Sequence, residues 1–221
     1  MRTSWQMRLS GSAAIVGGLM AIVMTPPFAT AYLRAYPDED PLPIWYDSVE
    51  PHLDPLLTFA SSETVYATYG RIYNLVYLLF IPVVIALHRA HDSSPSRLEK
   101  RGYVVLSCGL IAATVGVAGD YWGDGIGFGV ELLGLLSMII GVTMWGLALV
   151  RTRVVPVLWA WLMVICGPGA VATLVLIGHV PSGPTLSFAI VWLLVGCLIL
   201  SPKNKAAPVA DGMPGPPGGL R

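Results

Sequence analysis

Long apolar segments alternate with short polar segments along the chain as far as about residue 200. An α-helix rises about 1.5 Å per residue, so some 20 apolar residues cross the roughly 30 Å hydrocarbon layer of a bilayer. Six segments approach or exceed this length, at 11–33, 65–87, 103–121, 126–150, 154–177 and 185–200. The pattern therefore predicts an all-α fold, a polytopic transmembrane helical bundle of six spans. We expect residues 1–200 to form one transmembrane domain and the proline- and glycine-rich residues 201–221 to form a disordered tail.

The first apolar segment has two interpretations. Arg2 and Arg8, the apolar stretch 12–24 and the small residues 29–31 also describe a cleavable signal peptide. Removal of residues 1–31 would leave five spans. An uncleaved helix is favoured because the apolar character continues as far as Leu33.

Charge differs between the polar segments at the two ends of the predicted spans. Residues 34–63 carry seven acids and five prolines, which predicts an irregular loop with a short helix near 54–61. Nearly all basic residues outside the spans fall at the other end: Arg2, Arg8, Arg89, Arg97, Lys100, Arg101, Arg151, Arg153, Lys203, Lys205 and Arg221. The positive-inside rule therefore predicts that both termini are cytoplasmic and that the acidic loop 34–63 is extracytoplasmic.

Composition supports a membrane protein and excludes other classes. The chain is 55% hydrophobic and 12% charged, with a mean hydropathy of +0.69, whereas soluble domains carry about 25% charged residues. We expect the lipid bilayer of the plasma membrane as the main partner, with a homo-oligomer or other membrane subunits as further partners. No long basic run suggests a nucleic-acid partner. No metal site or cofactor is expected, since the cysteines lack metal-ligand spacing and the histidines are scattered.

The segment 116–134, GVAGDYWGDGIGFGVELLG, predicts a tight turn between two helices that pack closely. Small residues recur every seven positions on both sides of this turn. They are Gly102, Gly109, Gly116 and Gly123 before it and Gly127, Gly134, Gly141 and Ala148 after it. Such spacing keeps one small face turned to a neighbour and lets two backbones approach. We expect a close antiparallel pair.

Polar residues inside the spans predict a buried cluster near the extracytoplasmic surface. Arg71 and Glu131 each lie about one and a half turns inside a helix start, and a charge buried in lipid is costly unless it is paired. We expect an Arg71–Glu131 ion pair, with Asn74 and Asp120 beside it. The expected surrounding residues are Tyr69, Tyr73 and His179.

GFGVELLGLL at 127–136 and RTRVVPVLWAWL at 151–162 resemble segments of small multi-pass integral membrane proteins of high-GC bacteria, which have about six helices. That group has no assigned activity. The resemblance implies a membrane location and a helix count, and it implies no mechanism.

Three functions are compatible with this pattern. The first is a structural or binding subunit of a membrane assembly, in which the Arg–carboxylate cluster fixes helix register. The second is a small-molecule or ion- or proton-linked transporter, favoured by the carboxylates and by a helix break or kink expected at 167–169. The third is a membrane-embedded enzyme acting on a lipid, which would need a nucleophile and base within reach of each other. The sequence favours the first, with no catalytic residue assigned.

Overall fold

The computed structural model describes residues 2–37, 42–90, 96–123, 125–153 and 156–201. All regular structure in these ranges is helical. The helices are α1 (Arg2–Ala35), α2 (Tyr46–Leu57), α3 (Ser62–Ala90), α4 (Arg97–Trp122), α5 (Phe128–Thr152), α6 (Val157–Ile177) and α7 (Ser182–Leu200). Six of them, all except α2, are long and apolar enough to cross a membrane. The predicted six-span helical bundle is confirmed, and the chain is a multi-pass membrane protein.

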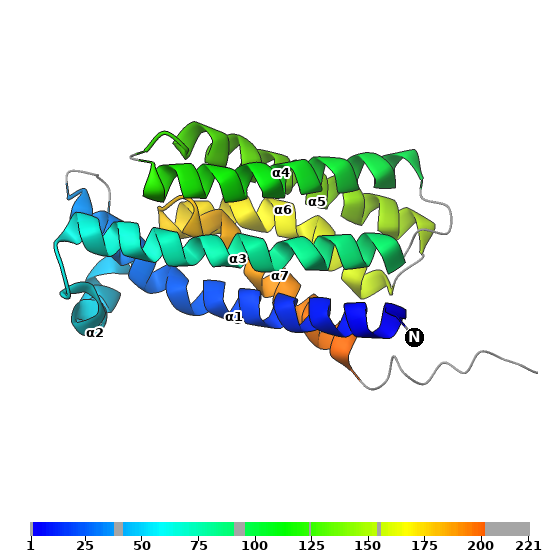
Figure 1. Ribbon diagram of the computed structural model, residues 1–221, viewed down its shortest axis with the longest axis horizontal. Helices are drawn as coiled ribbons and strands as arrows, with labels where there is room; N and C mark the ends of the chain where they lie inside the picture. The colour runs from blue at the N-terminus through cyan, green and yellow to red at the C-terminus, as the bar shows by residue number, and fades with distance from the viewer. Residues whose placement is uncertain (1, 38–41, 91–95, 124, 154–155, 202–221) are drawn as a thin grey trace, which may run out of the picture.

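The six long helices lie side by side along the long axis of the molecule, and α2 lies across one end (Figure 1). We call this end, with α2 and the turn between α4 and α5, the acidic end. The opposite end carries the start of α1, the end of α3 and the start of α4, and we call it the basic end (Figure 1). The predicted tail at 202–221 lies outside the described residues.

The predicted close pairing of α4 and α5 is confirmed by their glycines. A Cβ atom at Gly116 would collide with the backbone of Glu131, and one at Gly134 would collide with the backbone of Ala113. Gly141 meets the backbone of Leu106 in the same way. The two backbones touch because these residues have no side chain. Gly123 does not belong to this contact, since its nearest neighbour is a carbonyl of its own helix.

The acidic loop is more regular than predicted, because α2 occupies Tyr46–Leu57 and not the expected 54–61. Arg34 at the end of α1 holds it: its Nε donates to Glu50 Oε1 (2.9 Å) and its Nη2 donates to Asp54 Oδ1 (2.8 Å). Trp45 Nε1 donates to the carbonyl of Leu176 (2.9 Å), which ties the segment to α6. These contacts hold α2 and the residue before it against the ends of α1 and α6 at the acidic end.

The break expected at 167–169 does not occur, because α6 continues through this segment as one helix. Ser187 Oγ on α7 donates to the carbonyl of Cys166 (3.0 Å), and Gly169 lies against the same hydroxyl. Packing against α7 thus holds the helix together around Pro168. Of the break or kink expected here, which favoured a transporter, the break is therefore absent from α6.

Candidate functional site

The turn between α4 and α5 fixes the positions of Asp120 and Glu131. Gly125 has a φ of 86°, a left-handed conformation that glycine adopts without strain, and its N–H donates to the carbonyl of Asp120 (3.1 Å). A Cβ atom at Gly127 would meet the carbonyl of Gly116 and the N–H of Asp120. Asp120 therefore lies in the last turn of α4, and Glu131 lies in the first turn of α5 beside Gly116.

A pocket of about 550 Å³ opens at the acidic end, and we call it the acidic pocket. It is lined by Tyr32, Tyr36, Glu63, Tyr66, Ala67, Arg71, Asp120, Tyr121, Gly125 and Phe128, contributed by α1, α3, α4 and the following turn and helix. Its charged residues are two carboxylates and one guanidinium, which leave a formal charge of −1. Four tyrosine side chains and one phenylalanine form much of the remaining wall.

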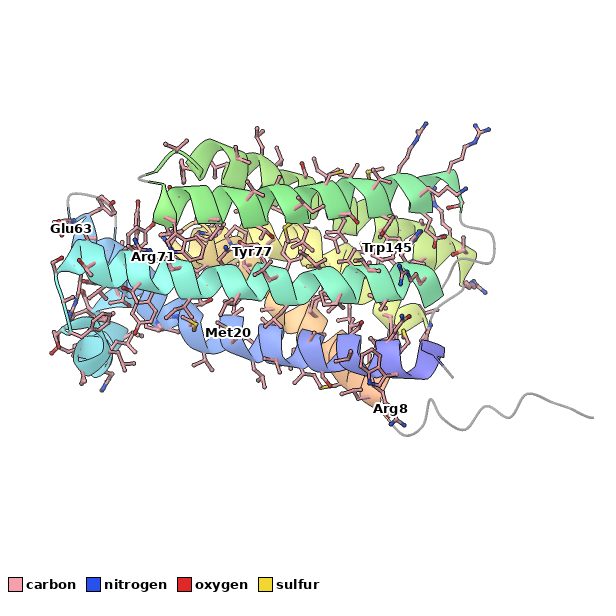
Figure 2. All side chains as sticks on the ribbon, in the orientation of Figure 1. Arg8, Met20, Glu63, Arg71, Tyr77 and Trp145 are labelled. Carbon is pink, nitrogen blue, oxygen red and sulfur yellow. The ribbon has the colours of Figure 1, made fainter. Side chains whose placement is uncertain are left out.

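Arg71 is exposed and is anchored by the end of α4. Its Nε donates to the carbonyl of Tyr121 (2.8 Å), one of the last carbonyls of α4, where a cation also complements the helix dipole. In the described ranges Arg71 makes no ion pair, although Glu63 and Asp120 line the same pocket. The pocket therefore presents separated charges of opposite sign (Glu63 and Arg71 are labelled in Figure 2).

Hydrogen-bonded side chains lie beneath two of the pocket tyrosines. The hydroxyls of Tyr66 and Tyr121 are 2.8 Å apart, and the Tyr66 hydroxyl lies 3.3 Å from His179 Nε2. His179 Nδ1 lies 2.8 Å from Ser182 Oγ. Because His179 is 2% exposed, burial lowers its pKa from 6.5 to about 3. The imidazole is therefore neutral at physiological pH.

Phe28 of α1 packs at the centre of these aromatic side chains. Its ring centroid lies 4.7 Å from that of His179, 5.1 Å from Tyr73, 5.5 Å from Tyr121 and 5.6 Å from Tyr66. Phe28 is completely buried, so four separate segments are packed together by one side chain. This packing gives the pocket a rigid base.

Glu131 is completely buried, and among the described residues neither of its carboxyl oxygens has a hydrogen-bond partner. It lies within electrostatic range of the Asp120 carboxyl group. It has the same relation to the hydroxyls of Tyr66, Tyr73, Tyr77 and Tyr121. Asn74 is 5% exposed, and its Oδ1 is also buried without a partner in the described part of the chain.

The predicted Arg71–Glu131 pair is wrong. No ion pair joins these two residues, both of which the structure describes, because Arg71 reaches the surface at the acidic pocket while Glu131 points into the bundle. The two other predicted cluster members, Asp120 and Asn74, also lie apart from each other. Asp120 lies in the pocket with Arg71, and Asn74 is buried, as Glu131 is.

The three residues expected around the cluster have different positions. Tyr69 is half-buried and donates to the carbonyl of Leu56 (3.1 Å), so it holds α2 and does not line the pocket. Tyr73 is buried, with its hydroxyl 3.4 Å from Thr25 Oγ1 on α1. His179 does not line the pocket, but its Nε2 contacts the hydroxyl of the pocket residue Tyr66.

Sequence reasoning missed most of the pocket lining, including Tyr32, Tyr36, Glu63, Tyr66 and Tyr121. Tyr32 and Tyr36 are four residues apart, and Tyr66 follows Glu63 by three, so each pair shares a helix face. Aromatic residues at the ends of spans are common because they lie at the lipid headgroups. Their presence in the sequence therefore does not by itself indicate a shared pocket.

The His179–Ser182 contact also escaped sequence analysis, although a serine beside a histidine can form a nucleophile–base pair. Ser182 is completely buried, and neither residue lines the acidic pocket. The two residues are three apart at the start of α7, where the contact fixes the connection from α6. The pair therefore joins the connection from α6 to the start of α7 and lies outside the lining of the acidic pocket.

The chain matches no protein-family profile, and neither curated proteins nor solved structures gave a match.

Proposed function

We propose that the protein is a binding subunit of the plasma membrane that holds a small zwitterionic compound in the acidic pocket. In this proposal the chain belongs to a bacterial membrane assembly, both termini are cytoplasmic and the pocket faces the extracytoplasmic side. The asymmetric distribution of arginine and lysine supports this orientation.

The observation that carries the proposal is the pair of opposite charges held apart in one aromatic pocket. Arg71, anchored on the Tyr121 carbonyl, suits a phosphate or carboxylate group. Asp120 and Glu63 suit an ammonium group, and tyrosine faces attract the same cation. A compound with an ammonium and an anionic group joined by a short linker is complementary to both halves.

Such a compound has two possible sources, a lipid headgroup or a free solute, and phosphocholine represents their shared chemistry. The protein would be placed in nanodiscs of phosphatidylglycerol alone, and its thermal midpoint measured with phosphocholine, choline or inorganic phosphate. Phosphocholine should raise the midpoint more than either fragment, because only the zwitterion occupies both charged halves. If the midpoint rises with phosphatidylcholine in the disc but not with free phosphocholine, the ligand is a lipid headgroup.

Variants identify the binding site in the same assay. Asp120→Asn and Arg71→Gln should each weaken phosphocholine binding about tenfold or more, since the first removes the charge that attracts the quaternary ammonium and the second removes a charged donor to the phosphate. Asp47→Asn is the matched control, because Asp47 lies on α2 at the same end and does not line the pocket. The proposal would be contradicted if Asp47→Asn weakened phosphocholine binding as much as Asp120→Asn does. It would also be contradicted if neither phosphocholine nor phosphatidylcholine raised the thermal midpoint of the parent.

A proton-linked transporter is the second candidate function. Glu131, a buried carboxyl group beneath a ligand pocket, favours it.

A further inference from the structure

Three buried oxygen atoms without hydrogen-bond partners in the described ranges lie below the acidic pocket. They are both carboxyl oxygens of Glu131 on α5 and Oδ1 of Asn74 on α3. All three are acceptors, so a positively charged species or a proton would satisfy them.

The contacts between helices place these atoms at one level of the bundle. Gly70 of α3 lies against the ring of Tyr121 on α4, and the two helices run in opposite directions (Figure 1). One turn toward the basic end, Asn74 is therefore level with Val117. The neighbouring residue Gly116 touches the backbone of Glu131. Asn74 and Glu131 thus lie at the same depth, about one turn below the Arg71 level of the pocket.

Among the residues that the structure describes, the groups within electrostatic range of Glu131 include no cation. On α4 they are Asp120 and Tyr121, and on α3 they are Tyr66, Tyr73 and Tyr77. Arg71 is exposed and bonded to the Tyr121 carbonyl, and no ion pair links it to Glu131. Burial without a cation and with Asp120 nearby disfavours a second negative charge. The positive end of the α5 dipole opposes these effects but is weaker than the cost of an unpaired buried carboxylate.

We propose that Glu131 is a proton-binding site, which holds a neutral carboxyl group at pH 7 and exchanges its proton with the acidic pocket through Asp120. Asp120 is the only carboxyl group that both lines the pocket and lies within electrostatic range of Glu131 in the described part of the chain. The proton leaves Glu131 as the carboxylate forms, passes to the Asp120 carboxylate and from there to water in the pocket. This proposal does not depend on which ligand the pocket holds.

Infrared spectroscopy of the protein in nanodiscs tests the protonation directly. Exposed aspartate and glutamate are ionised at pH 7, so a protonated-carboxyl C=O band at that pH reports a buried acid. We expect this band in the parent protein and its loss in Glu131→Gln. Glu99 is the matched control, because it is 2% exposed near the basic end with an unpartnered Oε1 among the described residues. The Glu131 band should persist in Glu99→Gln.

Two further variants keep the test decisive. If Glu131→Gln does not fold, Glu131→Asp retains a carboxyl group and should shift the band in frequency. The exchange route is tested by transfer into D₂O at pH 7, where Asp120→Asn should slow the isotope shift of the band at least tenfold. Asp47→Asn, which changes a carboxylate of α2 at the same end that does not line the pocket, should leave the exchange rate unchanged.

A band unaffected by both changes at Glu131, or one lost only in Glu99→Gln, would overturn the proton site. Unchanged exchange in Asp120→Asn would overturn the route through the pocket. Failure of phosphocholine to bind, with the Glu131 band present, would contradict the proposed ligand and leave the proton site supported.

Discussion

At the scale of single residues, Arg71 and Glu131 show what spacing along a chain predicts and what it does not. Counting residues gave their similar depths, but depth does not fix the direction of a side chain around its helix. Arginine has a long stem that can bring its charge to the surface, so Arg71 needs no buried partner. Dipole stabilisation of Glu131, typically about 0.3–1 kcal/mol, is small against the several kcal/mol of an unpaired buried charge.

Because Arg71 and Glu131 are not paired, replacing Arg71 should have a small effect on stability. Arg71→Met should cost only about 0.5–1.5 kcal/mol, because it removes one hydrogen bond to a carbonyl. In a double-mutant cycle with Glu131→Gln, measured by reversible unfolding in detergent, the coupling should be below about 0.5 kcal/mol. A coupling of several kcal/mol would show that Arg71 and Glu131 do form a buried pair.

His179 gives a prediction about pH. Its folded-state pKa of about 3 lies below the ordinary 6.5, so the unfolded state binds more protons between these values and stability falls as pH drops through this window. Between pH 7.5 and 5.5 this group should remove about 1–1.5 kcal/mol of stability.

The measurement compares unfolding free energies of the parent, His179→Gln and His52→Gln at both pH values. The decrease in unfolding free energy from pH 7.5 to pH 5.5 should be smaller in His179→Gln than in the parent, since the titrating group is gone. His52 lies on the exposed face of α2, and its replacement should leave the fall unchanged. A parent and His179→Gln that lose equal stability would show that His179 does not titrate in this way.

At the scale of elements, the sequence predicted helix pairing better than it predicted loops. The seven-residue glycine spacing depends on local geometry alone, and it identified the α4–α5 contact that Gly116 and Gly134 allow. By contrast, α2 includes Pro51 and Pro55, whose local preference opposes a helix, and contacts with Arg34 and Trp45 hold it in place. Those contacts join residues far apart in the chain and leave no local pattern.

The close approach of α4 and α5 predicts a large difference between two glycines of the same region. Gly116→Leu would force the backbone of Glu131 away, and overpacking of this kind typically costs about 1–3 kcal/mol or more. Gly129→Leu is the matched control, because a Cβ at Gly129 meets nothing within 4 Å.

Thermal unfolding of both variants in the same detergent measures this difference. Gly116→Leu should unfold at a clearly lower temperature than the parent, while Gly129→Leu should match or exceed it, since leucine favours helix more than glycine does. Equal midpoints for the two variants would show that the helices do not touch at Gly116.

At the scale of the whole molecule, the six spans could be predicted because length and hydropathy are set by the solvent. The acidic pocket could not, since it joins residues from α1, α3, α4, the following turn and the start of α5. Two of these residues, Glu63 and Arg71, lie at the end of the bundle that carries α2 (Figures 1 and 2). The proposed function depends on that end facing the extracytoplasmic side.

Cysteine labelling in intact cells reports which side of the membrane the acidic end faces. Ser48→Cys places a thiol on α2 at the acidic end, and Thr152→Cys places one at the end of α5 beside Arg151 and Arg153. The parent, whose Cys108, Cys166 and Cys197 lie within the spans, gives the background. An impermeant maleimide should label Ser48→Cys in intact cells and label Thr152→Cys only after lysis. Labelling of Thr152→Cys but not Ser48→Cys in intact cells would contradict the orientation and place the acidic pocket on the cytoplasmic side.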